Sequence, residues 1–525
     1  TMELPSTATM PHTFNYQEYL YYKNIYRIFN ADTIEIVGQN SWPNQIKSSL
    51  YRQMKKMPAQ EYLIAFLLGN MNDLETEALR DNGITHLFAV SGMHISLLAV
   101  FLTKVLRKLG RKRDILICVF LFFYAFLVGF TPSVLRSVFM FYGVTLNEWG
   151  NLKLSKLRIF SFVFLFMLCL NPFYLMDLGF QYSFLICFTF FFMKPHSNKI
   201  VNLFLTSAVA FLASLPISAI HFYEVNVLSV IWNMLFIPYV TYILYPLCVL
   251  CLFVNFLTPV LTFFLNVFEW LNVGLQQITI GRVVIPYIFA GWWLLYYGVL
   301  LLLLKSAKKK YLGYLLLFLC AVKVSSKINF SYYVYFLDVG QGDAAVINAP
   351  WQKEVLLIDT GGKMNYNTES WQVRKNKVKQ ASTIKTFLNA LGIAHIDALI
   401  LTHGDYDHAG NAFNLLEQMD IRNIVLNHNA YNSLEQEIVL SYEDKIRESY
   451  LPKSFKWDEY SFLMKDENAA SLIYRVELFS STFLFMGDTT KAEEKKLLKE
   501  DIQSDVLKVG HHGSKTSSSI SFLEK

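Results

Sequence analysis

Two hydropathy patterns divide the chain near residue 329. Before it, long apolar runs follow one another, and they predict about eight to ten membrane helices or half-helices, near residues 85–106, 114–130, 133–147, 157–175, 178–194, 200–222, 227–256, 258–276, 283–304 and 311–324. After it, short apolar runs alternate with polar turns, which is typical of strands mixed with helices. The pattern predicts a polytopic α-helical membrane domain followed by an α/β domain.

The α/β part is predicted to contain more strands than helices. Strands are expected at residues 332–337, 345–348, 354–358, 398–402, 423–426, 471–477, 482–486 and 506–509, and helices at 381–391, 409–419 and 491–499. The first 82 residues give weaker signals. Residues 47–82 are expected to form amphipathic helices along the membrane face, because the apolar run Tyr62–Gly69 is too short to cross a bilayer.

Composition agrees with a membrane protein. Hydrophobic residues make up 54% of the 525 residues and charged residues only 17%. Residues 84–330 carry 19 Lys and Arg against 5 Asp and Glu, whereas residues 331–525 carry 21 against 27. The basic excess is explained mainly by positive loops on the cytoplasmic side, although it is also the sign that attracts a polyanion. The acidic second part offers no general attraction for DNA.

Two basic loops set the expected orientation. Residues 104–113 hold six Lys and Arg, residues 305–310 hold four, and both loops are expected to face the cytoplasm. If the run 311–324 crosses the membrane, the α/β domain lies on the extracytoplasmic side of the cytoplasmic (inner) membrane. All six cysteines lie in apolar segments, away from the candidate chemistry described next.

Candidate metal ligands are concentrated just after one predicted strand. The stretch 402–411 contains His403, Asp405, Asp407 and His408 at a strand-to-helix turn. Asp488 ends a second strand, and two adjacent histidines, His511 and His512, follow a third. Imidazole and carboxylate ligands suit zinc, manganese or iron, and together these fragments predict a two-metal hydrolytic site. A surface turn rich in Asp and His is the alternative for the first fragment alone.

These fragments resemble the metallo-β-lactamase superfamily, whose HxHxDH motif corresponds to residues 403–408. The segments 338–344 (DVGQGDA), 358–361 (IDTG) and 510–514 (GHHGS) are similar to the hydrolase domain of the ComEC family of competence proteins. That resemblance implies an αββα sandwich. It also suggests that a closing strand and helix are absent after residue 525, and that residues 1–46 are the end of an N-terminal β-barrel (OB-like) domain.

The resemblance assigns roles to the ligand residues. His403 and Asp405 are expected at one divalent metal, Asp407 and His408 at the other, with Asp488 as a bridge and His511 completing the second site. His512 is the other candidate for that ligand, or a residue that contacts phosphate or protonates a leaving oxygen. Catalytic contributions are expected from Asp407, His512 and Lys508, with Ser514 also available to phosphate, and supporting roles from Asp359 and Asp343. Asp405 replaces the usual histidine, so the first site is expected to be weak. Manganese is favoured slightly over zinc because carboxylates are numerous.

Three polar segments interrupt the predicted membrane helices. Residues 83–95 resemble the "HLLAVSGLH" signature of the competence channel domain, and 129–137 and 177–184 are similar to two further motifs of that domain. Polar groups at membrane depth are costly unless they face protein or water. The candidates for a DNA path are His86, Ser91, His94, Arg136, Gln181 and Asn233. Helix packing is the alternative explanation for each of them.

The family resemblance implies four domains: an OB-like remnant (1–46), interfacial helices (47–82), a competence-type channel domain (83–328) and a metallo-β-lactamase-like hydrolase domain (329–525). It implies import of one DNA strand through the channel, degradation of the other strand by a metal-dependent nuclease, and receptor and motor proteins of a competence machinery as partners. Two alternatives stay open. One is a transporter whose hydrolase domain only binds, and the other is a membrane-anchored phosphodiesterase for another substrate.

Overall fold

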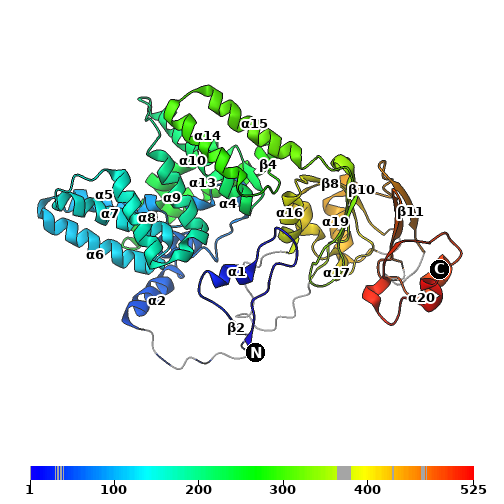
Figure 1. Cartoon of the computed structure of the whole chain (residues 1–525). Coiled ribbons are helices and arrows are strands. Elements are labelled where there is room, and N and C mark those ends of the chain that lie inside the picture. Colours follow the sequence, from blue (N-terminus) through cyan, green and yellow to red (C-terminus); the bar gives the residue numbers. More distant parts are fainter. Residues whose placement is uncertain are drawn as a thin grey trace. The chain divides into compact units, whose positions relative to one another are not determined.

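The computed structural model describes residues 2–29, 31, 35, 38, 41–362, 380–427, 431–462, 468 and 470–525. The chain forms two compact units (Figure 1). Unit 1 comprises residues 1–7, 15–283 and 288–319, and unit 2 comprises residues 8–14, 284–287 and 320–525. The helical first part and the sheet-containing second part confirm the coarse prediction of fold class. The OB-like remnant and the four predicted domain boundaries stay predictions.

Unit 1 is built mainly of helices (Figure 1). They are α1 (Tyr16–Tyr21), α2 (Trp42–Met54), α3 (Gln60–Leu68), α4 (Glu77–Asp81), α5 (Gly92–Val105), α6 (Arg111–Val128), α7 (Pro132–Trp149), α8 (Lys156–Leu170), α9 (Leu178–Phe190), α10 (Lys199–His221), α11 (Ser229–Tyr239), α12 (Tyr245–Cys251), α13 (Thr258–Gln276), α14 (Trp292–Ser306) and α15 (Lys309–Ser325), which runs on into unit 2. The short strands are β1 (Met2–Glu3), β2 (Ile28–Phe29), β3 (Glu224–Asn226) and β4 (Arg282–Val284).

Four helical stretches in the described part of the chain are long and apolar enough to cross a membrane. They are Thr85–Val105, Lys199–His221, Ser229–Cys251 and Asn255–Gln276. The third combines α11, a π-helical turn and α12, and a proline lies at residue 238 just before that turn. Two shorter apolar helices are α9 and α14. The larger number of spans and half-spans expected from hydropathy stays a prediction.

The centre of unit 1 is an aromatic core. The rings of Phe66 and Phe88 lie 5.0 Å apart, and Phe268 lies 5.0 Å from Phe88 and 5.1 Å from Phe236. Helix α3 supplies Phe66, and every side chain from Tyr62 to Leu68 is buried. A short helix that is apolar on all sides is stable only inside a core, so α3 lies within the bundle and not along its surface.

Unit 2 contains two sheets. The first has six strands in the order β10 (Ile446–Arg447), β9 (Asp420–Val425), β8 (His395–Ile400), β7 (Val355–Ile358), β6 (Ala345–Asn348) and β5 (Tyr333–Phe336). Neighbouring strands from β10 to β7 are parallel, whereas β6 pairs antiparallel with both β7 and β5. The second has the order β11 (Lys456–Tyr460), β12 (Ile473–Leu478), β13 (Ser481–Phe485) and β14 (Val506–Lys508), and only the pair β13–β14 is parallel.

The two sheets pack face to face, with helices on both outer faces. Alternate side chains of the first sheet, such as Ile347 and Ile400, share a buried cluster with Tyr474 and Phe485 of the second. The opposite side chains of the first sheet pack with α16 (Gln380–Ala390), α18 (Ala412–Gln418) and α19 (Ser433–Ser441). The outer face of the second sheet packs with α20 (Lys491–Leu497) and α21 (Ile520–Leu523). Strand ends from both sheets are thereby placed at one edge, next to the short helix α17 (Tyr406–Ala409).

Candidate metal centre

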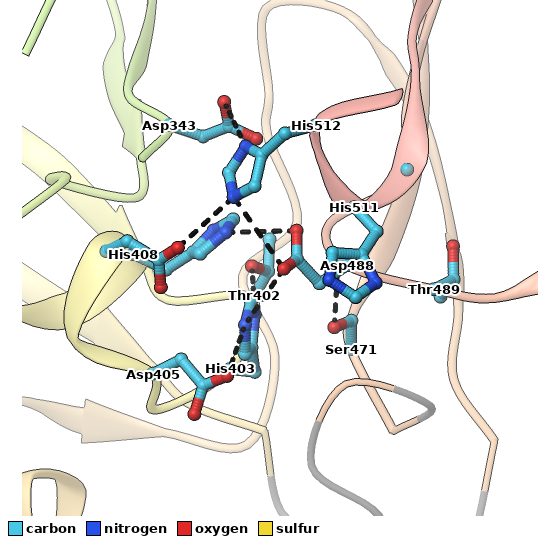
Figure 2. Close-up of polar contacts among 12 residues, drawn as sticks. Asp343, Thr402, His403, Asp405, His408, Ser471, Asp488, Thr489, His511 and His512 are labelled. Carbon is cyan, nitrogen blue, oxygen red and sulfur yellow. Dashed lines mark hydrogen bonds and ion pairs between the residues drawn. The ribbon is translucent and has the colours of Figure 1, made fainter. Parts of the chain in front are cut away.

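Acidic and imidazole side chains meet in unit 2 where strands of both sheets end. His403 and His408 follow β8, Asp488 follows β13, His512 follows β14, and Asp343 lies between β5 and β6. Figure 2 shows these side chains pointing toward a common centre. One ligand atom from each of Asp343, His408, Asp488 and His512 lies within 4.8 Å of the other three. Four segments far apart in the sequence therefore build one cage.

Asp488 occupies the middle of this cage (Figure 2). Its Oδ1 lies 3.0 Å from Nε2 of His408. Its Oδ2 lies 3.9 Å from Nε2 of His403 and 3.7 Å from Nε2 of His512. The backbone N–H of Asp488 donates to Ser471 Oγ at 3.2 Å, which fixes the start of the turn after β13. The carboxylate thus lies between the histidines that follow β8 and the histidine that follows β14.

Asp359 supports this arrangement from behind His408. Asp359 has a positive φ of 57° at the end of β7, and its Oδ1 accepts from the backbone N–H of Thr402 at 2.8 Å. Its Oδ2 accepts from Thr402 Oγ1 and lies 2.8 Å from Nδ1 of His408. A carboxylate at Nδ1 holds the proton on that nitrogen, so Nε2 is the nitrogen that faces Asp488.

Asp343 reaches the cage through a glycine-dependent contact. Gly342 has a φ of 86°, and a Cβ atom there would overlap the carbonyl oxygen of Asp407. The backbone N–H of Asp343 donates to that same oxygen at 3.2 Å. The Asp343 carboxylate accepts from Lys508 Nζ on one oxygen, and its other oxygen lies 3.4 Å from Nδ1 of His512. It therefore orients His512 much as Asp359 orients His408.

The electrostatics of the cage favour positive charge. Burial alone would lower the pKa of His408, but the charges of Asp359 and Asp488 outweigh burial and raise that pKa to about 11. Burial alone would raise the pKa of Asp488, and the imidazole of His408 instead lowers it to about 2. The hydrogen bond to Asp343 raises the pKa of His512. Positive charge, carried by protons or by a cation, is stabilised at this centre.

The donor atoms fit a divalent metal ion. His403 Nε2, His408 Nε2 and Asp488 Oδ1 are buried; the last two form an ion pair at 3.0 Å, and His403 Nε2 has no hydrogen-bond partner among the described residues. Buried polar atoms are nearly always paired, so the unpaired His403 Nε2, 3.9 Å from the Asp488 carboxylate, fits a site where a bound cation shares these donors. Imidazole nitrogen and carboxylate oxygen are the donors that zinc and manganese accept.

The remaining predicted ligands lie at the rim of the cage. Asp405 Oδ2 is 3.6 Å from Nε2 of His403, and Asp407 Oδ2 is 3.2 Å from Nε2 of His512. His511 lies apart from the four-residue cluster, and its Nδ1 is 3.1 Å from Thr516 Oγ1. The cluster contains His512, the other candidate for the ligand, and also Asp343, which was expected only in a supporting role.

The first polar segment of unit 1 is ordered by a local hydrogen bond. The backbone N–H of Ser91 donates to Nδ1 of His94 at 3.1 Å, and the Ser91 hydroxyl lies 3.3 Å from the same nitrogen, which closes the start of α5. His94 is fully buried, and its ring lies 4.5 Å from the ring of Tyr245. Its Nε2 has no partner in the described part of the chain. His86, on the preceding 3₁₀ turn, is exposed.

The other candidates for a DNA path lie on separate helices. Gln181, on α9, donates from Nε2 to the carbonyl oxygen of Leu175 at 2.7 Å. Asn233, on α11, has a buried Oδ1 that lacks a partner among the described residues. Arg136, on α7, donates from Nε to Ser183 Oγ at 2.6 Å. These contacts describe how the residues are held, and their role in transport stays a prediction.

Comparison with known proteins identifies both parts of the chain. Residues 67–310 match the family model described as Competence protein, and residues 337–525 match the Metallo-beta-lactamase superfamily. The chain is also 28% identical over 581 residues to ComE operon protein 3 of Bacillus subtilis (strain 168), an alignment that covers 100% of this chain and 74% of that protein. The chain belongs to the ComEC/Rec2 family of competence proteins.

Two more family relatives show how far the likeness extends. Competence protein ComA of Neisseria gonorrhoeae is 25% identical over 537 residues, which is 94% of this chain and 73% of that protein. The Uncharacterized protein MG316 homolog of Mycoplasma pneumoniae is 32% identical over 201 residues, which is 38% of this chain and 51% of that protein. The cage described above lies within the metallo-β-lactamase domain of this competence-family member.

Two contributors to the cage were not singled out from the sequence. Thr402 bonds the carboxylate of Asp359, and Ser471 holds the backbone of Asp488. Thr402 directly precedes the ligand run, so its position was a usable signal. Ser471 lies 17 residues before Asp488, and nothing in its neighbourhood distinguishes it from a surface serine.

Proposed function

We propose that this chain is an inner-membrane channel that imports single-stranded DNA and carries a metal-dependent nuclease domain that degrades the other strand. The observation that carries the proposal is the cage around Asp488, where imidazole and carboxylate donors fit a divalent cation, in a chain that also contains a competence domain. A nuclease joined to a channel removes one strand where the other enters.

The nuclease assignment follows from what the cage residues do. Asp488 lies between three histidines from two segments and is suited to bridge two cations. Lys508 and His512 both contact the Asp343 carboxylate, so they lie together on one side of the cage. There they can contact phosphate oxygens and a leaving oxygen. When bound, divalent metal ions lower the pKa of water and stabilise the charge that develops on a phosphodiester.

The proposed cofactors are two divalent ions, manganese or zinc. The cluster of Asp343, His408, Asp488 and His512, with Asp407 beside it, forms the stronger site. His403 and Asp405 form the weaker site, because the Asp405 side chain is 42% exposed. Carboxylate oxygens make up half of the stronger cluster, which favours manganese.

Location and partners follow from the same proposal. In this proposal unit 1 is a multi-pass domain of the inner membrane, which its apolar helices support, and the basic loop 104–113 supports a cytoplasmic side for the nearby helix ends. Unit 2 then lies on the extracytoplasmic side, where incoming duplex arrives. A receptor would deliver the duplex, and a separate motor would draw the single strand inward.

The experiment measures both activities of the full chain. Purified in detergent, it is expected to digest end-labelled DNA when manganese is added, and Asp407→Ala is expected to abolish digestion. Asp501→Ala, at a side chain that is 84% exposed and remote from the cage, is the matched control. In cells, the same chain is expected to restore uptake of labelled DNA to a competent strain that lacks its own channel.

The outcomes separate this proposal from the alternatives. Uptake without metal-dependent digestion would remove the nuclease and leave the channel. Digestion of an envelope polymer such as a teichoic-type ester, with DNA left intact, would indicate a membrane-anchored phosphodiesterase. If the protein is folded and in the membrane but takes up no DNA, the channel function is contradicted.

A further inference from the structure

Arg136 lies among the helices of unit 1 and has no acidic partner among the described residues. Arg136 is on α7, its Nε donates to Ser183 Oγ at 2.6 Å, and its Nη2 donates to Ser137 Oγ at 3.1 Å. The guanidinium carbon lies 6.0 Å from the centre of the Phe184 ring. In the part of the chain that the structure describes, no carboxylate oxygen lies within 4.0 Å of this guanidinium. Among the described residues, the groups around this partly buried charge are two hydroxyl groups and one aromatic ring.

This arrangement leaves the positive charge of Arg136 without a counter-ion in the described part of the chain and leaves some of its N–H donors available for hydrogen bonds. A guanidinium stays protonated in proteins and offers five N–H donors, of which the two serines take two. Hydroxyl oxygens accept hydrogen bonds but do not neutralise a positive charge. An uncompensated cation within an apolar helical bundle is costly, and such residues generally mark a ligand or transport path. The fork of remaining donors matches the paired oxygens of a phosphate group.

The surroundings of Arg136 are assembled from all three polar segments of the sequence. Helices α5 and α9 both pack on α7 (Figure 1), and they bring Gly92 and Ser183 to the arginine. A Cβ atom at Gly92 would lie 2.5 Å from Arg136 Nη2 and closer still to Ser137 Oγ, so a larger residue there would displace these side-chain ends. The hydroxyls of Ser133 and Ser183 lie 3.2 Å apart, and they extend the polar surface beyond the guanidinium.

We propose that Arg136, with the hydroxyls of Ser133 and Ser183, binds one phosphodiester group of a nucleic-acid strand during its passage through unit 1. The single positive charge matches the single negative charge of a phosphodiester, and no base-reading group is needed. This inference rests on the proposed import function for its choice of ligand. A phospholipid head group carries the same chemistry, and the experiment distinguishes the two.

The test measures binding of a fluorescent oligothymidine to the detergent-solubilised full chain in EDTA, at several salt concentrations. Arg136→Gln is expected to weaken binding by about tenfold or more, as for other hydrogen bonds to charged groups. It is also expected to reduce the slope of log affinity against log salt by about 0.7, the value for one neutralised phosphate on a single strand. Arg136→Lys is expected to keep the slope and lose part of the affinity.

A glycine pair provides the structural control. Gly92→Ala keeps the net charge of the chain but displaces the guanidinium. It is therefore expected to bind the oligothymidine more weakly than the parent chain. Gly298→Ala, on α14, places a methyl group where no atom lies within 4 Å, and it is expected to bind like the parent chain. Unfolding temperatures of all variants are compared, and if Arg136→Gln does not fold, Arg136→Lys and Gly92→Ala decide the question.

The results have distinct consequences. Unchanged affinity and salt slope in folded Arg136→Gln would overturn the inference, as would a loss confined to binding of vesicles that contain an anionic phospholipid. If the parent chain imports labelled DNA and Arg136→Gln imports it equally well and binds it equally well, the site is wrong and the import function stands. If the parent chain imports no DNA yet binds oligothymidine through Arg136, the import function is wrong and the site stands.

Discussion

Nδ1 of His408 lies 2.8 Å from Oδ2 of Asp359, a residue 49 positions earlier in the chain. The same oxygen accepts from the hydroxyl of Thr402, so Asp359 ties the end of β7 to the turn after β8. The contact sets which nitrogen of His408 faces Asp488, and the affinity of the cage for a cation therefore depends on a residue that does not contact the centre.

Asp359→Ala is expected to lower the affinity for manganese by about 10- to 100-fold, the usual cost of losing such a supporting residue. Titration calorimetry on the full chain measures it, and Asp501→Ala serves as the control because its side chain is 84% exposed. If Asp359→Ala binds manganese as tightly as the parent chain, the orientation of His408 does not depend on this carboxylate.

The two adjacent histidines after β14 are predicted to behave differently. His512 lies in the cluster with Asp488, whereas His511 is hydrogen-bonded to Thr516. His512→Ala is expected to lower bound metal in the purified chain well below that of His511→Ala, measured by elemental analysis after dialysis. Each variant is the control for the other, since both remove one imidazole from the same turn. The reverse order would assign the ligand to His511.

The metal-free domain is predicted to have a defined pH optimum of stability. The pKa of His408 is raised from 6.5 to about 11 in the folded chain. Its contribution to folding stability is therefore complete below pH 6.5 and is lost as pH rises toward 11. The pKa of Asp488 is lowered from 3.8 to about 2 in the folded chain, so its contribution to folding stability is present above pH 3.8 and is lost as pH falls toward 2. Stability around β8 in EDTA is therefore expected to be greatest between pH 3.8 and 6.5.

Deuterium exchange of peptides from β8, corrected for the intrinsic rate at each pH, measures this dependence in the full chain. Protection is expected to decrease from pH 6.5 upward. In His408→Gln this decrease is expected to be smaller, because the titrating group is gone. Protection that rises with pH in the parent chain would contradict the assignment of a charged His408 in the metal-free protein.

Sidedness is tested by cysteine labelling. In a background without the six native cysteines, Lys499→Cys in unit 2 is expected to react with a membrane-impermeant maleimide added to intact cells. Lys108→Cys, in the basic loop after α5, is exposed in the folded chain and is expected to react only after the cells are permeabilised. Labelling of Lys108→Cys but not Lys499→Cys in intact cells would reverse the proposed orientation.

Local pattern was sufficient for much of unit 2. The run 398–401 is apolar and lies between polar residues, and β8 forms there because both faces of a central parallel strand are buried. By contrast, β11 contains Lys456, Asp458 and Glu459, and its residues give no apolar alternation of the kind used to predict strands. It forms because it pairs with β12, a long-range interaction that short-range pattern does not encode.

The choice between neighbouring residues also depended on the fold. His511 and His512 have the same chemistry and adjacent positions, and both have positive φ values, 47° and 49°. Which imidazole enters the cage is set by the direction of this turn relative to Asp488 and Asp343. In unit 1, similarly, Arg136 was a candidate from its own motif, but the serine that binds it lies 47 residues away on α9.

The sequence by itself determined the kinds of elements, the apolar helices of the first part, and the residue types able to hold a metal ion, because these follow from local periodicity and side-chain chemistry. Only the tertiary structure decided which of them meet. Asp343, His408, Asp488 and His512 share one centre because strands from two sheets end at the same edge, and Gly92, Arg136 and Ser183 share another because three helices pack together. Such convergence is a property of long-range packing, which no single stretch of the chain contains.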